Sequence, residues 1–348
     1  MTTNGNAGDL AIVGGYRTPF TKAGTELKDA QAADLATHVF REVLDRTGID
    51  PDDIDEVILG CAGAGPHEAN PARVAALRAG LPQRVPAVTV MRNCASGMES
   101  LLAANMRLRA GDGEAFLVGG AESMSNFPLI MGPELSGFFQ RLSKAKSPWR
   151  KLSTLLSFRP TFLKPRVAIL EGLTDPVSGL MMGNTADGVA RLMGVSRSEQ
   201  DQYALLSHHR AAAARSSGRF NHEIAPIAPP PKFGGIVSQD NGIRQAQTLE
   251  QLAGLRPIFD RREGDVTVGN ACQVTDGAAA MLVMSEGRAN AMGLEPVAIV
   301  RSHARVGLDP AHMGLGPAHV IPMLLDNTGL SLSDIDLFEI NEAFAAQV

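Results

Sequence analysis

Short apolar runs and amphipathic helical stripes alternate along most of the chain. Apolar, β-branched runs bounded by turn residues predict buried strands, at residues 10–13, 54–59, 87–91 and 114–118. Apolar residues at helical spacing predict helices, at residues 33–47, 70–77, 96–110 and 196–216. Glycines that suit helix ends follow two of these helices, at Gly48 and Gly111. The alternation predicts an α/β fold built on a mainly parallel, layered sheet.

Cys94 lies where the predicted strand at 87–91 turns into the predicted helix at 96–110. The free N–H groups and the positive end of the dipole at a helix N-terminus favour an anion, and a thiolate is the nucleophilic form of cysteine. Asn93, Ser96 and Gly97 are small or flexible enough to let a substrate approach the sulfur. Two interpretations stay open at this point: a nucleophile, or a small buried apolar side chain.

The chain also repeats itself. Residues 38–55 resemble residues 319–336 at a constant offset, without a gap. Each copy reads as a helix, a glycine stop, a short turn and a strand, which indicates a duplicated α/β half. The first copy continues through the Cys94 helix to Ser125, whereas the second is followed only as far as Val348. If the halves match, on the order of 60 further residues are expected after Val348.

A long insertion, residues 127–248, separates the two halves. Its stretch 138–166 holds eight Lys and Arg residues and no acidic residue, with Phe and Trp side chains interleaved. Such a segment could lie on an anionic membrane surface, dock a partner subunit or face the phosphates of a bulky substrate. A solvated loop explains the composition equally well, so the pattern alone does not choose among these roles.

Composition excludes several classes of protein. The chain has 348 residues, of which 44% are hydrophobic and 20% are charged, as in soluble proteins of two or three domains. A net charge of −5 gives no reason to expect nucleic acid as a partner. Three cysteines are too few for a disulfide framework or a zinc cluster, so we expect no metal and a cytoplasmic location. Neither nucleotide-binding glycine motif, G-x-x-x-x-G-K-[ST] or a post-strand G-x-G-x-x-G, occurs.

Seven short motifs occur in an order that resembles one family, the thiolases (acetyl-CoA acetyltransferases and 3-ketoacyl-CoA thiolases), over essentially the whole chain. They are R-T-P at 17–19, N-C-A-S-G at 93–97, G-G-A-E-S-M-S at 119–125, M-G-N-T-A at 182–186, D-G-A-A at 276–279, M-G-L-G-P at 313–317 and N-E-A-F at 341–344. The resemblance implies an α/β fold of two duplicated α/β/α/β/α halves with an inserted loop domain, the second half being truncated. It places the N-terminal half at 8–126 and 249–290, the loop domain at 127–248, and the start of the C-terminal half at 291–348.

The resemblance also implies a reaction, namely acyl transfer between two coenzyme A thioesters. Coenzyme A is then a substrate, and no cofactor is bound permanently. Cys94 matches the family nucleophile, and Asn341 matches the Asn that helps to hold the thioester oxygen through a water. The positions that match the lining of the pantetheine tunnel are Met182, Cys272, Ala343 and Phe344. The family's usual assembly implies a homodimer or homotetramer.

Two family motifs have no counterpart in the sequence. The resemblance calls for a His in a G-H-P motif as the base for the nucleophile, and for a second Cys in a C-x-G motif. Both follow N-E-A-F in the family, and none of the eight His residues here lies in such a motif. We therefore expect this 348-residue chain to be poorly stable and to turn over little. The alternative is a non-catalytic, thiolase-like subunit that binds acyl-CoA or serves as a scaffold.

Overall fold

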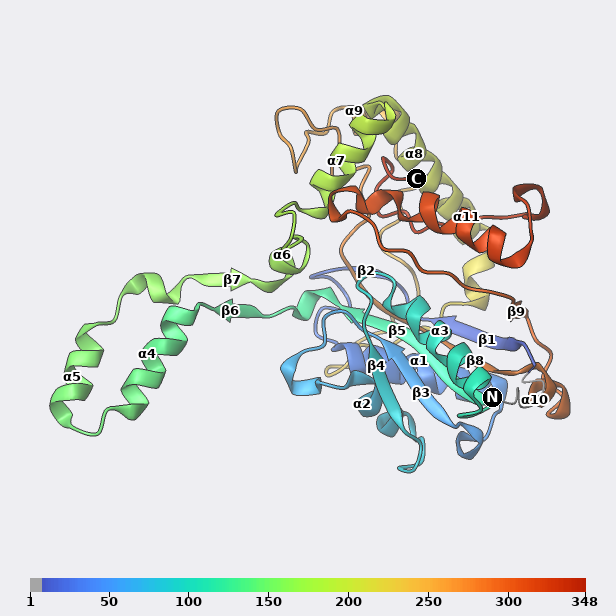
Figure 1. Ribbon diagram of the computed structural model, residues 1–348, viewed down its shortest axis with the longest axis horizontal. Coiled ribbons are helices and arrows are strands. Elements are labelled where there is room, and N and C mark those ends of the chain that lie inside the picture. Colours follow the sequence, from blue (N-terminus) through green and yellow to red (C-terminus); the bar gives the residue numbers. More distant parts are fainter. Residues whose placement is uncertain (1–7) are drawn as a thin grey trace. The chain divides into compact units, whose positions relative to one another are not determined.

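The computed structural model describes residues 8–348, which fall into two compact units (Figure 1). Among the described residues, unit 1 combines residues 8–126 with Gly183–Val348, and unit 2 is Phe127–Met182. The unit boundary at 182 lies inside the predicted loop domain of residues 127–248. The three-part domain division from the sequence remains a prediction.

Unit 1 is built on a seven-stranded sheet with the order β4-β3-β5-β8-β1-β9, in which β2 also pairs with β8. Its strands are β1 (Leu10–Arg17), β2 (Thr21–Lys22), β3 (Glu56–Gly60), β4 (Ala87–Val90), β5 (Ala115–Ser123), β8 (Thr275–Ser285) and β9 (Ala298–Val300). The strands predicted at the start of the chain therefore form, but β4 is a half-buried edge strand rather than a buried one.

The expectation of a mainly parallel sheet is wrong. Only the pairs β4–β3 and β3–β5 are parallel, whereas β8 pairs antiparallel with both β5 and β1, and β9 pairs antiparallel with β1. β8 comes from residues far downstream and inserts between two early strands, which separates β1 from the parallel group. Its Asp-Gly-Ala-Ala-Ala start carries no β-branched pattern, so the sequence did not predict this strand.

Helices cover both faces of the sheet because successive side chains of each strand point to opposite faces. On one face, α1 (Ala32–Thr47) and α2 (Pro71–Ala79) pack against Val57 and Leu59. On the other, α3 (Ser96–Ala110) packs against Ile58 and Val118 (Figure 1). Gly48, at a φ of 67°, ends α1 in the left-handed conformation, as its position in the sequence predicts.

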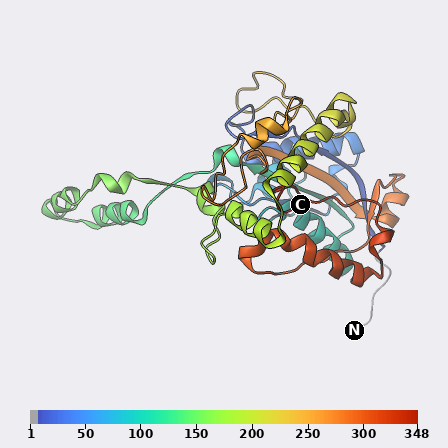
Figure 2. The same ribbon diagram turned by 90° about the horizontal axis from the view of Figure 1, so that it is seen from above.

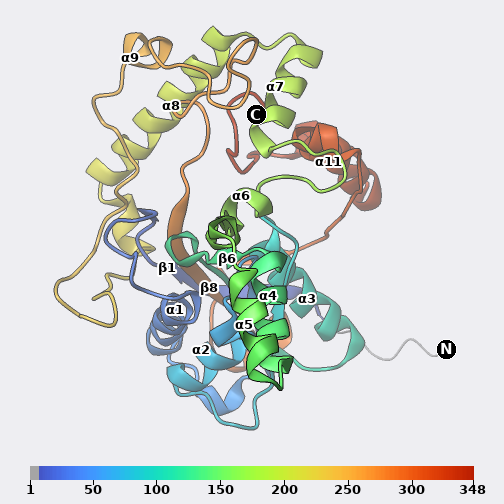
Figure 3. The same cartoon turned by 90° about the vertical axis from the view of Figure 1, so that its left-hand side faces the viewer.

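The remaining α-helices of unit 1 are α7 to α11, of which α7, α8, α9 and α11 lie together beyond the sheet (Figure 3). The bounds are Met182–Met193 for α7, Arg197–Ser216 for α8, Leu249–Ala253 for α9, Glu286–Ala291 for α10 and Gly316–Thr328 for α11. α8 forms where a helix was predicted and begins with a capping box, in which Ser196 and Glu199 each accept a hydrogen bond from the other's backbone N–H.

The second copy of the repeat reproduces the first only in part. α11 ends at Gly329 with a φ of 68°, and a short 3₁₀ turn at Leu332–Asp334 follows, as α1, Gly48 and Pro51–Asp53 do in the first copy. The predicted strand after residue 336 does not form. In the first copy β3 is paired on both sides, whereas within residues 8–348 no strand flanks the equivalent segment.

Unit 2 is a hairpin in which β6 and β7 run side by side and carry helices between them (Figure 2). Its elements are β6 (Leu129–Met131), α4 (Pro133–Lys144), α5 (Pro148–Leu156), β7 (Pro165–Val167) and α6 (Ala168–Gly172). Phe138 packs edge-on against Phe158 at a centroid distance of 5.3 Å, and Phe162 adjoins both rings. Among the helices of residues 8–348, none is long and apolar enough to cross a membrane.

Candidate active site

Cys94 is solvent-exposed on the turn that joins β4 to α3. Asn93 takes a left-handed φ of 47°, a conformation that Asn adopts more readily than most residues. Ser96 fixes the turn, because its hydroxyl accepts from the Arg92 N–H at 2.8 Å and donates to the Asn93 carbonyl at 2.6 Å. The strand–turn–helix placement predicted from the sequence is confirmed, and the thiol stands at the start of a helix.

Glycines in the neighbouring strands allow the start of α3 to lie directly on the sheet. A β-carbon on Gly60 would be 2.1 Å from the Ser96 carbonyl oxygen, and one on Gly120 would be 3.0 Å from the Gly97 α-carbon. The buried Ser100 hydroxyl adds a polar link, because it donates to the Gly97 carbonyl and accepts from the Gly119 N–H. These contacts fix the position of the Cys94 turn relative to β3 and β5.

A half-buried carboxylate lies at the ends of the same two strands. Glu122 on β5 accepts from the backbone N–H groups of Ala62 and Gly63 at 2.9 and 3.0 Å. Burial raises the pKa of this carboxyl. Burial, and next the charge of Glu122, raise the pKa of the neighbouring Cys61 thiol to about 12. Cys61 is therefore protonated at neutral pH and is a poor nucleophile.

A polar pocket of about 420 Å³ holds two of the residues singled out from the sequence, Cys272 and Asn341. Desolvation of the thiol is the main cause that raises the pKa of Cys272, and the charge of the Cys94 thiol is the second. His208 and Arg244 line the same pocket, and the pKa of His208 is lowered by burial first and by Arg244 second.

Backbone pairing with residues 271–272 brings two more of the predicted residues, Ala343 and Phe344, to this pocket. The Cys272 N–H donates to the Ala343 carbonyl at 2.9 Å, and Ala271 forms a β-bridge with Phe344. The Phe344 side chain is buried and packs edge-on against Phe259 at a centroid distance of 6.1 Å. Met182 is the last residue of unit 2, so its place relative to the other candidates is not assigned.

Two pocket residues that hold the C-terminal segment were missed in the sequence. From one face of α8, Tyr203 donates its hydroxyl to Glu342 at 2.9 Å, and Ser207 donates to the other carboxylate oxygen at 2.6 Å. Both lie in the wall that contains Asn341. Their separation by one helical turn, which places both side chains on one face of α8, was the available signal.

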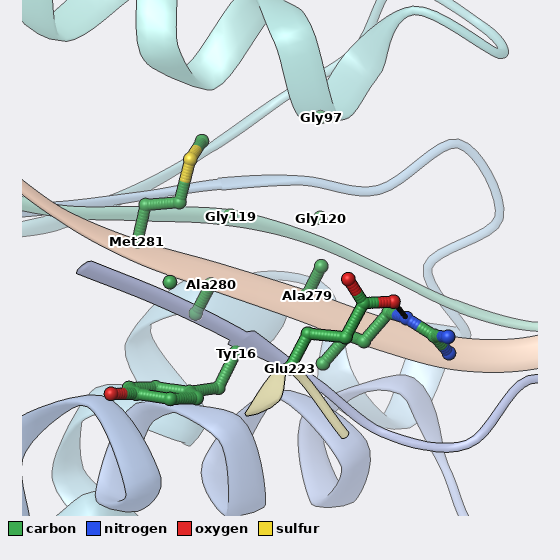
Figure 4. A pocket seen from close by; sticks show the side chains of 10 residues that line it. Tyr16, Gly97, Gly119, Gly120, Glu223, Ala279, Ala280 and Met281 are labelled. Carbon is green, nitrogen blue, oxygen red and sulfur yellow. Dashed lines mark hydrogen bonds and ion pairs between the residues drawn. The ribbon is translucent and has the colours of Figure 1, made fainter. Parts of the chain in front are cut away.

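A second cleft, of about 380 Å³, lies over the small residues of β1, β5 and β8 (Figure 4). Gly97, next to the Cys94 turn, forms part of its wall. Arg17 closes another side and pairs with Glu223 at 2.9 Å and, through two bonds of 2.8 and 2.9 Å, with Asp240. The R-T-P motif thereby ties β1 to the segment around residues 223–240.

Comparisons with known proteins identify relatives along the whole described chain. The family model "Thiolase, N-terminal domain" matches residues 10–287, and "Thiolase, C-terminal domain" matches residues 294–348. A "Probable acetyl-CoA acyltransferase" of Staphylococcus epidermidis is 39% identical over 340 residues, which are 97% of this chain and 81% of that protein. One of Staphylococcus aureus is 37% identical over 341 residues, 97% of this chain and 82% of that protein.

Solved structures give the same result. The Bacillus anthracis acetyl-CoA acetyltransferase superposes with a TM-score of 0.88 at 37% identity, covering 98% of this chain and 81% of that chain. Human mitochondrial 3-ketoacyl-CoA thiolase in complex with CoA superposes with a TM-score of 0.86 at 34% identity, covering 98% of this chain and 81% of that chain. The predicted α/β fold class is confirmed by these matches.

Proposed function

The chain belongs to the thiolase family, and from this premise we propose that Cys94 carries the acyl group in a CoA-dependent acyl transfer. The reaction class, thiolase-type acyl transfer with coenzyme A as substrate, follows from family membership. The assignment of Cys94 is supported by one observation above all. Its thiol is exposed at the start of α3, and its charge is the second cause of the raised pKa of Cys272, which lines the pocket that also holds Asn341.

The chemistry balances in two steps. In the first, the Cys94 sulfur attacks the 3-keto carbonyl carbon of a 3-ketoacyl-CoA, so a carbon–sulfur bond forms. The bond between the α- and β-carbons then breaks, and the acetyl-CoA enolate leaves and takes up a proton. In the second step, the thiol of free coenzyme A attacks the Cys94 thioester and regenerates the Cys94 thiol. The resemblance gives the two proton transfers to the histidine of G-H-P and the cysteine of C-x-G.

Asn341 is proposed to stabilise the negative charge that develops on the thioester oxygen. Its segment is fixed on two sides, since Tyr203 and Ser207 hold Glu342 and the Cys272 N–H holds the Ala343 carbonyl. A donor held in advance near a developing oxyanion is commonly worth about 3 kcal/mol of the activation barrier. Cys272, Met182, Ala343 and Phe344 stay proposed contacts of the pantetheine arm.

Thiolysis of a 3-ketoacyl-CoA by the purified protein tests the assignment. We expect Cys94→Ser to lower kcat/KM by at least about 10⁴-fold. We expect Cys272→Ser, the matched control, to retain activity within about tenfold. Equal loss in the two variants would contradict the assignment. Acyl-CoA binding without any turnover by the wild type would favour the non-catalytic subunit instead.

The proposal also covers the direction of the reaction, the location of the enzyme and its assembly. We propose that the enzyme cleaves 3-ketoacyl-CoA in fatty-acid β-oxidation, with the Claisen condensation of two acyl-CoA thioesters as the reverse of the same reaction. A cytoplasmic location and a homodimer or homotetramer complete the proposal. Sedimentation of the purified protein tests the assembly, and a monomer at all concentrations would exclude it.

A further inference from the structure

The basic, aromatic stretch at residues 138–166 has no part in the proposed acyl transfer, yet it makes up about half of unit 2. We propose that unit 2 is a peripheral docking element that binds the surface of anionic phospholipid bilayers. This inference goes beyond the acyl-transfer function and does not depend on it.

The first observation is an unpartnered apolar stripe on α5. Trp149, Leu152 and Leu156 follow one another at i, i+3 and i+7, so they lie on one side of the helix. Their exposed fractions are 80%, 47% and 79%. Leu155, which widens the same stripe, is 52% exposed. An exposed stripe of this size marks an interaction surface.

Unit 2 does not need this stripe for its own packing. Its small core is formed on α4, where Leu135 and Phe138 are buried. Phe158 and Phe162, which follow α5 along the chain, complete that core through ring contacts with Phe138 and with each other. The stripe of α5 is therefore free to contact something outside the unit.

The second observation is a surplus of positive charge around the stripe. Of the eight basic residues at 138–166, only Arg166 has an ion-pair partner among residues 8–348, and that partner is Glu171. Arg150 and Lys151 border the stripe on α5 itself. An apolar stripe with bordering Lys and Arg is the arrangement of a helix that lies in a bilayer interface.

The composition favours lipid over a protein partner. Lysine is depleted in the cores of protein–protein interfaces, yet four of the eight basic residues here are lysines. Long basic side chains can reach lipid phosphates while their stems follow the apolar stripe. A tryptophan at the edge of such a stripe suits the headgroup region, where its ring is half in apolar and half in polar surroundings.

The chain has a single tryptophan, Trp149, so its fluorescence reports on this site alone. We expect the emission of the full chain to shift to the blue with vesicles that contain about 30% phosphatidylserine. We expect no shift with pure phosphatidylcholine vesicles at about 0.15 M salt. Raising the salt to about 1 M, which shortens the Debye length to about 3 Å, should weaken co-sedimentation with the anionic vesicles.

Two variants separate the apolar and the ionic parts while keeping Trp149. Replacing Leu152 and Leu156 by Ser should lower the partition coefficient by at least about tenfold. Replacing Lys146, Arg150 and Lys151 by Gln should lower it by about 100-fold, at about fivefold per charge. All five side chains are exposed, so we expect both variants to fold as the wild type does.

Matched controls come from unit 1. Val297→Ser removes an exposed apolar side chain, and replacing Arg256, Arg261 and Arg262 by Gln removes three exposed charges. We expect both to bind anionic vesicles as the wild type does. Failure of the wild type to bind them, or equal loss in the unit 1 controls, would overturn the proposal. A Trp149 shift produced by a protein fraction but not by vesicles would also overturn it and would assign unit 2 to protein docking.

Discussion

The close approach of Gly60 to the start of α3 allows a prediction with a magnitude. In Gly60→Ala the new β-carbon would lie 2.1 Å from the Ser96 carbonyl oxygen and 2.5 Å from the Gly97 nitrogen. Both are backbone atoms, so no side chain can turn away. Restoring an ordinary contact of about 3.4 Å requires the turn to move by roughly 1 Å. We expect a loss of about 1–3 kcal/mol in stability from overpacking.

The same displacement moves Cys94 relative to the pocket. A misplacement of about 1 Å can lower a rate by about 100-fold, and we expect this loss in the acylation of Cys94 by acyl-CoA. Mass spectrometry of the intact protein after rapid quenching measures that rate. Alkylation of Cys94 by iodoacetamide should change far less, because the thiol stays exposed.

Two other glycines calibrate this experiment. Gly120→Ala brings a β-carbon to 3.0 Å from the Gly97 α-carbon, so a shift of a few tenths of an ångström suffices, and we expect less than about tenfold loss in rate. Gly188, inside α7, has open space around its β-carbon position, and Ala there should leave acylation unchanged. Wild-type acylation by Gly60→Ala would refute the view that β3 positions the nucleophile turn.

Three further predictions concern ionisable groups of unit 1. Arg17→Ala leaves Asp240 without its bidentate partner and should lower the free energy of unfolding by about 3 kcal/mol in urea titrations. Adding Asp240→Asn should restore part of the lost stability, and no recovery would contradict the ion pair. Burial lowers the pKa of His38, so the unfolded chain binds a proton more readily than the folded chain does. The free energy of unfolding should therefore fall as the pH falls below about 6.5. His38→Gln should flatten that part of the stability profile, and an unchanged slope would exclude the effect. Cys61, with a pKa of about 12, should resist iodoacetamide at neutral pH until the protein is unfolded, and rapid labelling in the native state would contradict its burial.

The parts of the fold that depend on local sequence could be predicted. The turn at Cys94 follows from a short apolar strand, small residues and a helical stripe, all within one stretch of chain. The ends of α1 and α11 follow from Gly48 and Gly329, because glycine readily adopts the left-handed backbone conformation in which both helices end. Each of these signals lies within a few residues of the structure it determines.

The parts that depend on distant pairing could not. β8 is a strand because β5 and β1 flank it on both sides, and its small residues carry no strand pattern of their own. The hydrogen bonds from Tyr203 and Ser207 to Glu342 join residues well over one hundred positions apart. The repeat predicted a strand after residue 336 from its likeness to β3, but a strand also needs neighbours to pair with.

Covalent capture of the acyl group tests the central claim most directly. The purified protein is mixed with isotopically labelled acyl-CoA, quenched in acid and digested for peptide mass spectrometry. The account predicts one labelled thioester, on the peptide that contains Cys94, and none after Cys94→Ser. An unlabelled Cys94 in an enzyme that turns over its substrate, or a label on Cys272 instead, would contradict it.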